Sequence, residues 1–180
     1  MIQVWNRQRR IRIDSGAVKL FCGALAESLN LSDYAFSVIF VGTAAMRRLN
    51  KEWRGQDHAT DVLSFAYDDE LVDGLPFHGE IVIAPEIAAR QAENNPKRPG
   101  ASRLSAAGLR PAKSTVNGTE GLVIGATERE IRKLIVHGAL HLMGYDHETD
   151  DDEMIRIQNR VLRRRFFSAT ACLILREQGR

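Results

Sequence analysis

The chain has 180 residues, of which 44% are hydrophobic and 27% charged, and its formal net charge is +2. This size and composition are typical of one globular domain with its own core, and two cysteines 150 positions apart exclude a small disulfide-framework protein. No apolar run approaches the roughly 20 residues of a membrane span, and the polar N-terminus lacks the apolar segment of a secretory signal, so we expect a cytoplasmic protein without membrane contact.

The first third of the chain predicts two strands and two helices. The strands are residues 1–6 and 34–42, and the helices are residues 14–32 and 43–55. Asp14 or Ser15 is the expected cap of the first helix, Thr43 that of the second, and Gly55 is expected to end the second helix.

The middle of the chain predicts a further strand pair and a helix. The strands are residues 60–67 and 79–84, an acidic loop of residues 68–78 separates them, and the helix is residues 85–95. Residues 96–119 are basic, contain no acid and show no periodicity. We expect a flexible basic insertion at about residues 98–120.

Two long helices are predicted toward the C-terminus. One spans residues 127–144 and starts with a capping box of Thr127 and Glu130; the other spans residues 150–178. About four strands and five helices alternate without repeats, which predicts an α+β fold: a single domain, residues 1–180, with a small mixed sheet covered by helices, one of them a zincin-like metal helix.

Three of the five histidines lie close together in the segment HGALHLMGYDH. His137 and His141 are four residues apart and therefore share one helix face. Gly144 can end the helix in a left-handed conformation, after which His147 can turn back toward the pair. Three histidine ligands with one open position are typical of a catalytic zinc site.

The residue after the first histidine is Gly138, where metzincin peptidases carry the glutamate that acts as general base. Ordinary metalloprotease chemistry therefore lacks its base, and a phosphodiester becomes a plausible substrate for the metal. A phosphodiester is negatively charged, so its binding requires a cation nearby. Arg54 can supply one in bidentate fashion, and the alternative is that Arg54 pairs on the surface with Asp57 or Asp61.

Three blocks of the sequence, HGALHLMGYDH, LNKEWRGQDHATDVLSF and GEIVIAPEIAARQA, resemble the YbeY family of bacterial rRNA maturation endoribonucleases. The resemblance implies one zinc ion held by His137, His141 and His147, and it places the family's functionally important arginine at Arg54. It also implies single-strand-specific cleavage of RNA, a role in 16S rRNA 3′-end processing and ribosome quality control, and partners in the small ribosomal subunit and its associated factors.

Two other functions stay open: a ribosome assembly factor with a structural metal, and another zinc hydrolase such as a peptidase. Asp146 is a candidate to orient a histidine ring or to act as a base. Lys51, Arg98 and Arg103 are candidate RNA contacts because of their charge.

Overall fold

Four strands form one mixed sheet in the order β1-β2-β4-β3, in which only β3 runs antiparallel to its neighbour. The computed structural model describes residues 2–30, 35–72, 75–94, 118–145, 152–163 and 172–175. The elements are β1 (Ile2–Asn6), α1 (Ser15–Ser28), β2 (Ala35–Phe40), α2 (Thr43–Arg54), β3 (Val62–Val72), β4 (Leu75–Ile83), α3 (Pro85–Asn94), α4 (Gly118–Leu142) and α5 (Glu153–Leu162). The predicted α+β architecture is confirmed.

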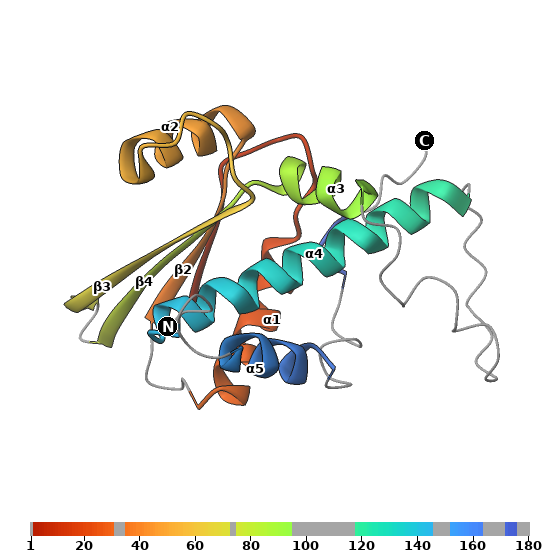
Figure 1. The fold of residues 1–180 in the computed structure, drawn as a ribbon. Helices are drawn as coiled ribbons and strands as arrows, with labels where there is room; N and C mark the ends of the chain where they lie inside the picture. Colours follow the sequence, from red (N-terminus) through yellow and green to blue (C-terminus); the bar gives the residue numbers. More distant parts are fainter. Residues whose placement is uncertain are drawn as a thin grey trace.

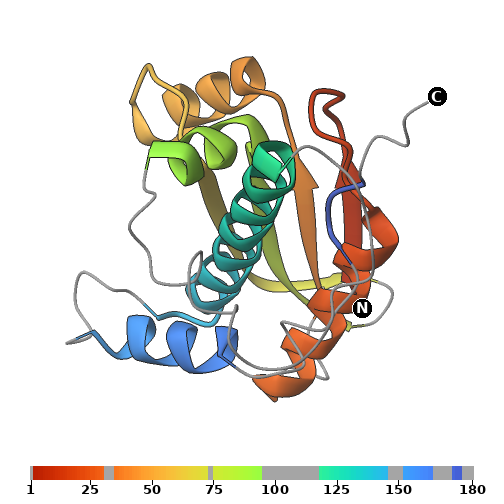
Figure 2. The same cartoon turned by 90° about the vertical axis from the view of Figure 1, so that its right-hand side faces the viewer.

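Helices cover both faces of the sheet (Figure 1). On one face α1, α4 and α5 enclose the larger core, which includes Phe21, Phe40 and Ile135, and α4 crosses the sheet between the other two (Figure 2). On the other face α2 closes a smaller core around Met46 and Val82. Among the described helices, none has the length and apolar character needed to span a membrane.

Local signals account for several element ends. Asp14 caps α1, since its carboxylate accepts a hydrogen bond from the Ala17 N–H at 2.9 Å. Gly55 ends α2 with a φ of 69° in the left-handed region, as predicted. Thr43 is not the cap of α2: Gly42 holds that position, and the Thr43 hydroxyl donates instead to Glu86 Oε2 at 2.9 Å.

Three predicted boundaries are wrong. The acidic segment expected as a loop continues β3 and β4, whose pairing extends to Val72 and Leu75. Helix α4 begins before the predicted capping box: Thr127 is buried within it, and Glu130 pairs with Lys133 at 2.6 Å. This start also makes residues 118–120 of the predicted insertion helical, whereas residues 95–117 lie outside the described part of the chain.

The predicted C-terminal helix, residues 150–178, is also too long. Helix α5 ends at Leu162, and residues 172–175 are not helical. Ile174 instead forms an antiparallel bridge with Ile13, and the Leu175 N–H donates to the Arg12 carbonyl at 2.8 Å. This long-range pairing attaches the C-terminal segment to the residues that precede α1.

Candidate metal centre

His137 and His141 lie one turn apart near the C-terminal end of α4, and their rings face each other. Their Nε2 atoms are 3.2 Å apart, and the ring planes meet at 88°. Both side chains are only partly buried. The predicted placement of two imidazoles on one helix face is therefore found in the structure.

The other ring nitrogens hold the two rings in place. His141 Nδ1 lies 2.9 Å from the Tyr145 carbonyl oxygen, and His137 Nδ1 lies 3.1 Å from Gln158 Oε1 on α5. A carbonyl oxygen only accepts, so a neutral ring that bonds to it through Nδ1 carries its proton there and keeps a lone pair on Nε2. Gln158 is buried and lies 21 positions from His137, and no local sequence pattern pointed to it.

The separation of the two Nε2 atoms shows whether both could bind the same metal ion. Nitrogen ligands at 2.0–2.1 Å from a tetrahedral zinc ion lie about 3.3 Å apart. The observed 3.2 Å between His137 and His141 agrees with this value. The two residues therefore suit a divalent metal ion such as zinc.

The turn after α4 has the predicted form. Gly144 adopts a φ of 85°, its N–H donates to the His141 carbonyl at 2.9 Å, and the Tyr145 N–H donates to the Leu140 carbonyl at 3.1 Å. His147 and Asp146 follow this turn but lie outside the described residues. Within the described ranges, no cluster of three or more metal-binding side chains is present.

Gly138 lies where α4 packs directly against the sheet. A Cβ atom at this position would lie 2.5 Å from Ile81 Cγ2 and 3.0 Å from Ser64 Oγ. The sequence alone identifies this glycine only as the absence of a general base. The structure adds a steric reason, because any side chain here would push the helix that carries the histidines away from β3 and β4.

Arg54 ends α2 with an exposed side chain. Both acids that could have paired with it have other partners. Asp57 binds Arg47 at 2.8 Å and Lys51 at 3.3 Å, while Asp61 accepts from its own neighbours. In the described part of the chain Arg54 forms no ion pair, so the surface-pair alternative is not observed.

The candidate RNA contacts differ in their placement. Lys51 is exposed and pairs with Asp57, whereas Arg98 and Arg103 lie outside the described residues. Hydrogen bonds from Arg47 and Lys51 hold the pKa of Asp57 below its usual value. Asp57 therefore stays charged and neutralises part of the positive charge on α2.

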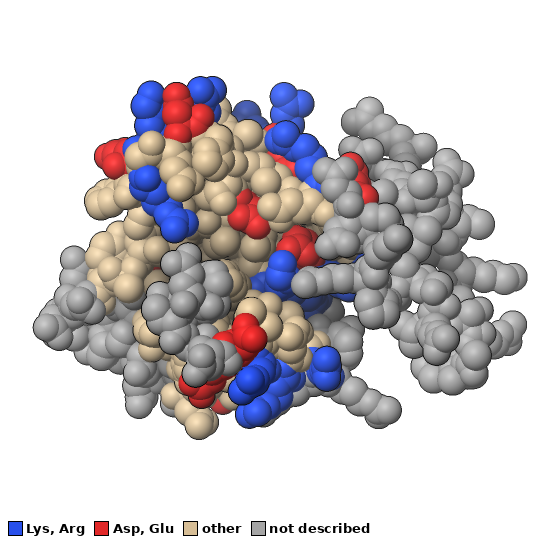
Figure 3. Space-filling view, viewed as in Figure 1, with Lys and Arg blue, Asp and Glu red and all other residues tan. Residues whose placement is uncertain are grey.

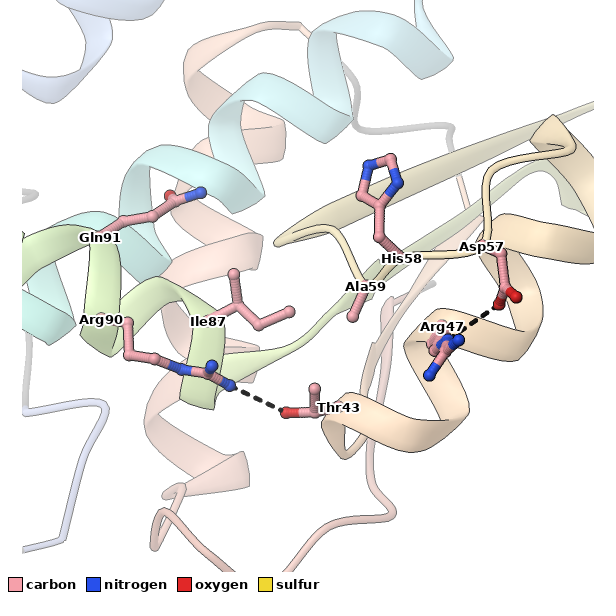
Figure 4. A pocket seen from close by; sticks show the side chains of 8 residues that line it. All are labelled: Thr43, Arg47, Asp57, His58, Ala59, Ile87, Arg90 and Gln91. Atoms are coloured by element: carbon pink, nitrogen blue, oxygen red, sulfur yellow. Dashed lines mark hydrogen bonds and ion pairs between the residues drawn. The ribbon is translucent and has the colours of Figure 1, made fainter.

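A shallow groove of about 530 Å³ separates α2 from α3 (Figure 4). Its two arginines are already bonded within the protein: Arg47 pairs with Asp57, and Arg90 donates to the Thr43 hydroxyl at 3.5 Å. The groove is lined by Thr43, Arg47, Asp57, His58, Ala59, Ile87, Arg90 and Gln91. It does not include the histidine pair, so we do not assign it to the metal centre.

Comparisons with known proteins give a consistent result. The family model described as Endoribonuclease YbeY matches residues 3–104 and 119–165. A protein named Endoribonuclease YbeY from Thermodesulfovibrio yellowstonii is 31% identical over 178 residues, which cover 89% of this chain and 94% of the relative. One of the same name from Thermus thermophilus is 32% identical over 165 residues, which cover 90% and 99%. The solution structure of TM1509 from Thermotoga maritima matches with a TM-score of 0.53 and 27% identity, covering 89% of this chain and 85% of that one.

Proposed function

Because the chain belongs to the endoribonuclease YbeY family, whose members are enzymes that hydrolyse RNA, we propose that it is a zinc-dependent, single-strand-specific endoribonuclease of rRNA maturation. Its proposed tasks are 16S rRNA 3′-end processing and ribosome quality control. Its proposed partners are the rRNA precursor, the small ribosomal subunit and ribosome-associated factors in the cytoplasm.

The main support for this proposal is the convergence of the His137 and His141 rings. Their Nε2 atoms are spaced as two ligands of one tetrahedral ion, and hydrogen bonds at both Nδ1 atoms orient the rings. His147 is the proposed third ligand, since it follows the turn at Gly144. A zinc ion held there would polarise an oxygen of the scissile phosphate and lower the pKa of a water molecule.

Arg54 is the proposed phosphate-binding residue. Its guanidinium is exposed, and within the described residues no carboxylate neutralises it. A planar guanidinium can donate two parallel hydrogen bonds to a phosphate and offset the charge that builds up during the reaction. Asp146 is proposed to orient a histidine ring or to accept the proton, because Gly138 offers no acceptor.

A peptidase of the metzincin type is disfavoured by the packing of α4. A glutamate in place of Gly138 would clash with Ile81 and Ser64, so the usual base of such enzymes does not fit at this position. Another alternative is an assembly factor whose metal is structural. The two roles differ in what the loss of one ligand does to cleavage and to folding.

The test compares wild type with His141→Ala in cleavage of a single-stranded RNA, with His58→Ala as the matched control at an exposed histidine. We expect His141→Ala to stay folded, to lose cleavage and to keep its binding to small ribosomal subunits, while His58→Ala cleaves like wild type. Unchanged cleavage by His141→Ala would refute the proposed site. Unfolding of this variant would favour a structural metal.

A further inference from the structure

Trp53 is an unusually exposed aromatic residue on α2. Its exposed fraction is 65%, and it meets Phe65 of β3 in a T-shaped contact with the ring centroids 5.6 Å apart. This contact fixes the indole but occupies only part of its surface. A large apolar face therefore remains open to solvent beside Arg54, the next residue in the chain.

The surroundings of Trp53 are basic. Helix α2 carries Arg47, Arg48, Lys51 and Arg54 against one acid, Glu52, and Asp57 beyond the helix pairs with Arg47 and Lys51, so basic residues still outnumber acids here. Lys and Arg side chains lie over this helix at the upper left of the molecule, with acidic side chains among them (Figure 3, with α2 labelled in Figure 1). An aromatic face within positive charge fits an anionic ligand with flat rings better than an apolar protein surface.

Two adjacent residues of the edge strand β3 lie next to the two regions, one beside Trp53 and the other beside Gly138. Phe65 belongs to the smaller core beneath α2 and contacts Trp53, whereas Ser64 lies under Gly138 on the opposite face. Successive side chains of a strand point to opposite faces, so Trp53 and Gly138, the residue after His137, lie on opposite sides of β3. Since β3 is the last strand of the sheet, a polymer can curve around this edge from one site to the other.

We propose that Trp53 is a stacking platform for an unpaired base of the RNA substrate, with Arg54 holding a phosphate beside it. A base in a duplex has both faces covered by its neighbours, whereas a base in a single strand can lie on an indole. The platform therefore selects single-stranded RNA. This inference rests on the proposed endoribonuclease function and assigns part of its substrate recognition to one residue.

Fluorescence tests the contact directly, because Trp5 and Trp53 are the only tryptophans in the chain. In a Trp5→Phe background, an oligoadenylate of about ten nucleotides should quench the Trp53 emission, whereas an abasic strand of equal length should not. The measurement is made on His137→Ala protein, so that cleavage does not intervene. Equal quenching by both strands, or none by oligoadenylate, would refute stacking.

Steady-state cleavage of single-stranded RNA tests its importance. We expect Trp53→Leu to raise KM by roughly 5- to 150-fold with a smaller change in kcat, and Trp53→Phe to restore most of the loss. Trp5→Leu is the matched control, since Trp5 is 50% exposed on β1 at the opposite edge of the sheet. Thermal melting verifies that each variant is folded.

The outcomes separate this inference from the function on which it rests. Wild-type cleavage with an unchanged KM in Trp53→Leu would refute the platform and leave the endoribonuclease intact. A wild-type protein that cleaves no RNA, with or without zinc, would refute the proposed function itself. A change in self-association of Trp53→Leu at constant KM would show that the surface binds protein instead, and would also overturn the inference.

Discussion

Gly138→Ala tests the close packing on which the metal helix depends. The added Cβ atom would lie 2.5 Å from Ile81 Cγ2, well inside contact distance. Ile81 cannot move away easily, because it is fully buried on β4, and β4 pairs with a strand on each side. Its Cγ2 atom is also bound directly to Cβ, so that a rotation of the outer side chain does not displace it. Alanine should therefore move α4 away from the sheet.

The magnitude follows from two opposing terms. Alanine in place of glycine inside a helix stabilises by about 1 kcal/mol, and overpacking of a core costs about 1–3 kcal/mol. Gly125→Ala in the same helix is the matched control, since among the described residues its Cβ would meet only Arg129 Nη1 at 3.5 Å, an ordinary contact. The stabilisation from replacing glycine by alanine in a helix is the same in both variants. The free energy of unfolding of Gly138→Ala should therefore be lower than that of Gly125→Ala by about 1–3 kcal/mol.

Urea unfolding followed by circular dichroism measures both free energies. We expect Gly125→Ala to match or exceed wild type, and Gly138→Ala to fall below Gly125→Ala with an unchanged slope. Equal stabilisation of the two variants would show that the sheet accommodates a side chain at this position. The steric explanation for the glycine would then be wrong.

Two further substitutions probe how the site is assembled. Arg54→Lys should lower kcat about tenfold or more, because the side chain loses its planar guanidinium group but keeps its charge. The urea midpoint should not change, since the side chain is exposed. A kcat equal to that of wild type would show that Arg54 does not bind the phosphate. Gln158→Leu should weaken zinc binding about 10- to 100-fold in a chelator competition, because the hydrogen bond that orients His137 is lost. An unchanged zinc affinity would show that this contact does not position the ring.

Local patterns are sufficient to predict the pairing of His137 with His141 and several element ends. Spacing alone places His137 and His141 on one face, and glycine chemistry accounts for the ends of α2 and α4 at Gly55 and Gly144. The helices form where apolar periodicity matches the face that they bury, and the continuous apolar run of β2 matches a strand that is buried at every position.

The errors arise where long-range contacts decide the structure. The pairing of β3 with β4 continues through an acidic segment, and Ile174 pairs with Ile13 where a helix was predicted. Similarly, the contact of Gly138 with Ile81 and the bond of Gln158 to His137 join residues from different elements. Neither periodicity nor capping signals contain this information.

The central claim is that the histidines at the end of α4 hold one metal ion. Elemental analysis of wild-type and His137→Ala protein, loaded with zinc and dialysed free of excess, tests it most directly, with His58→Ala as control. We expect about one zinc ion per chain in wild type and in the control, and little in His137→Ala. Equal zinc in His137→Ala and wild type, or none in wild type, would contradict the account.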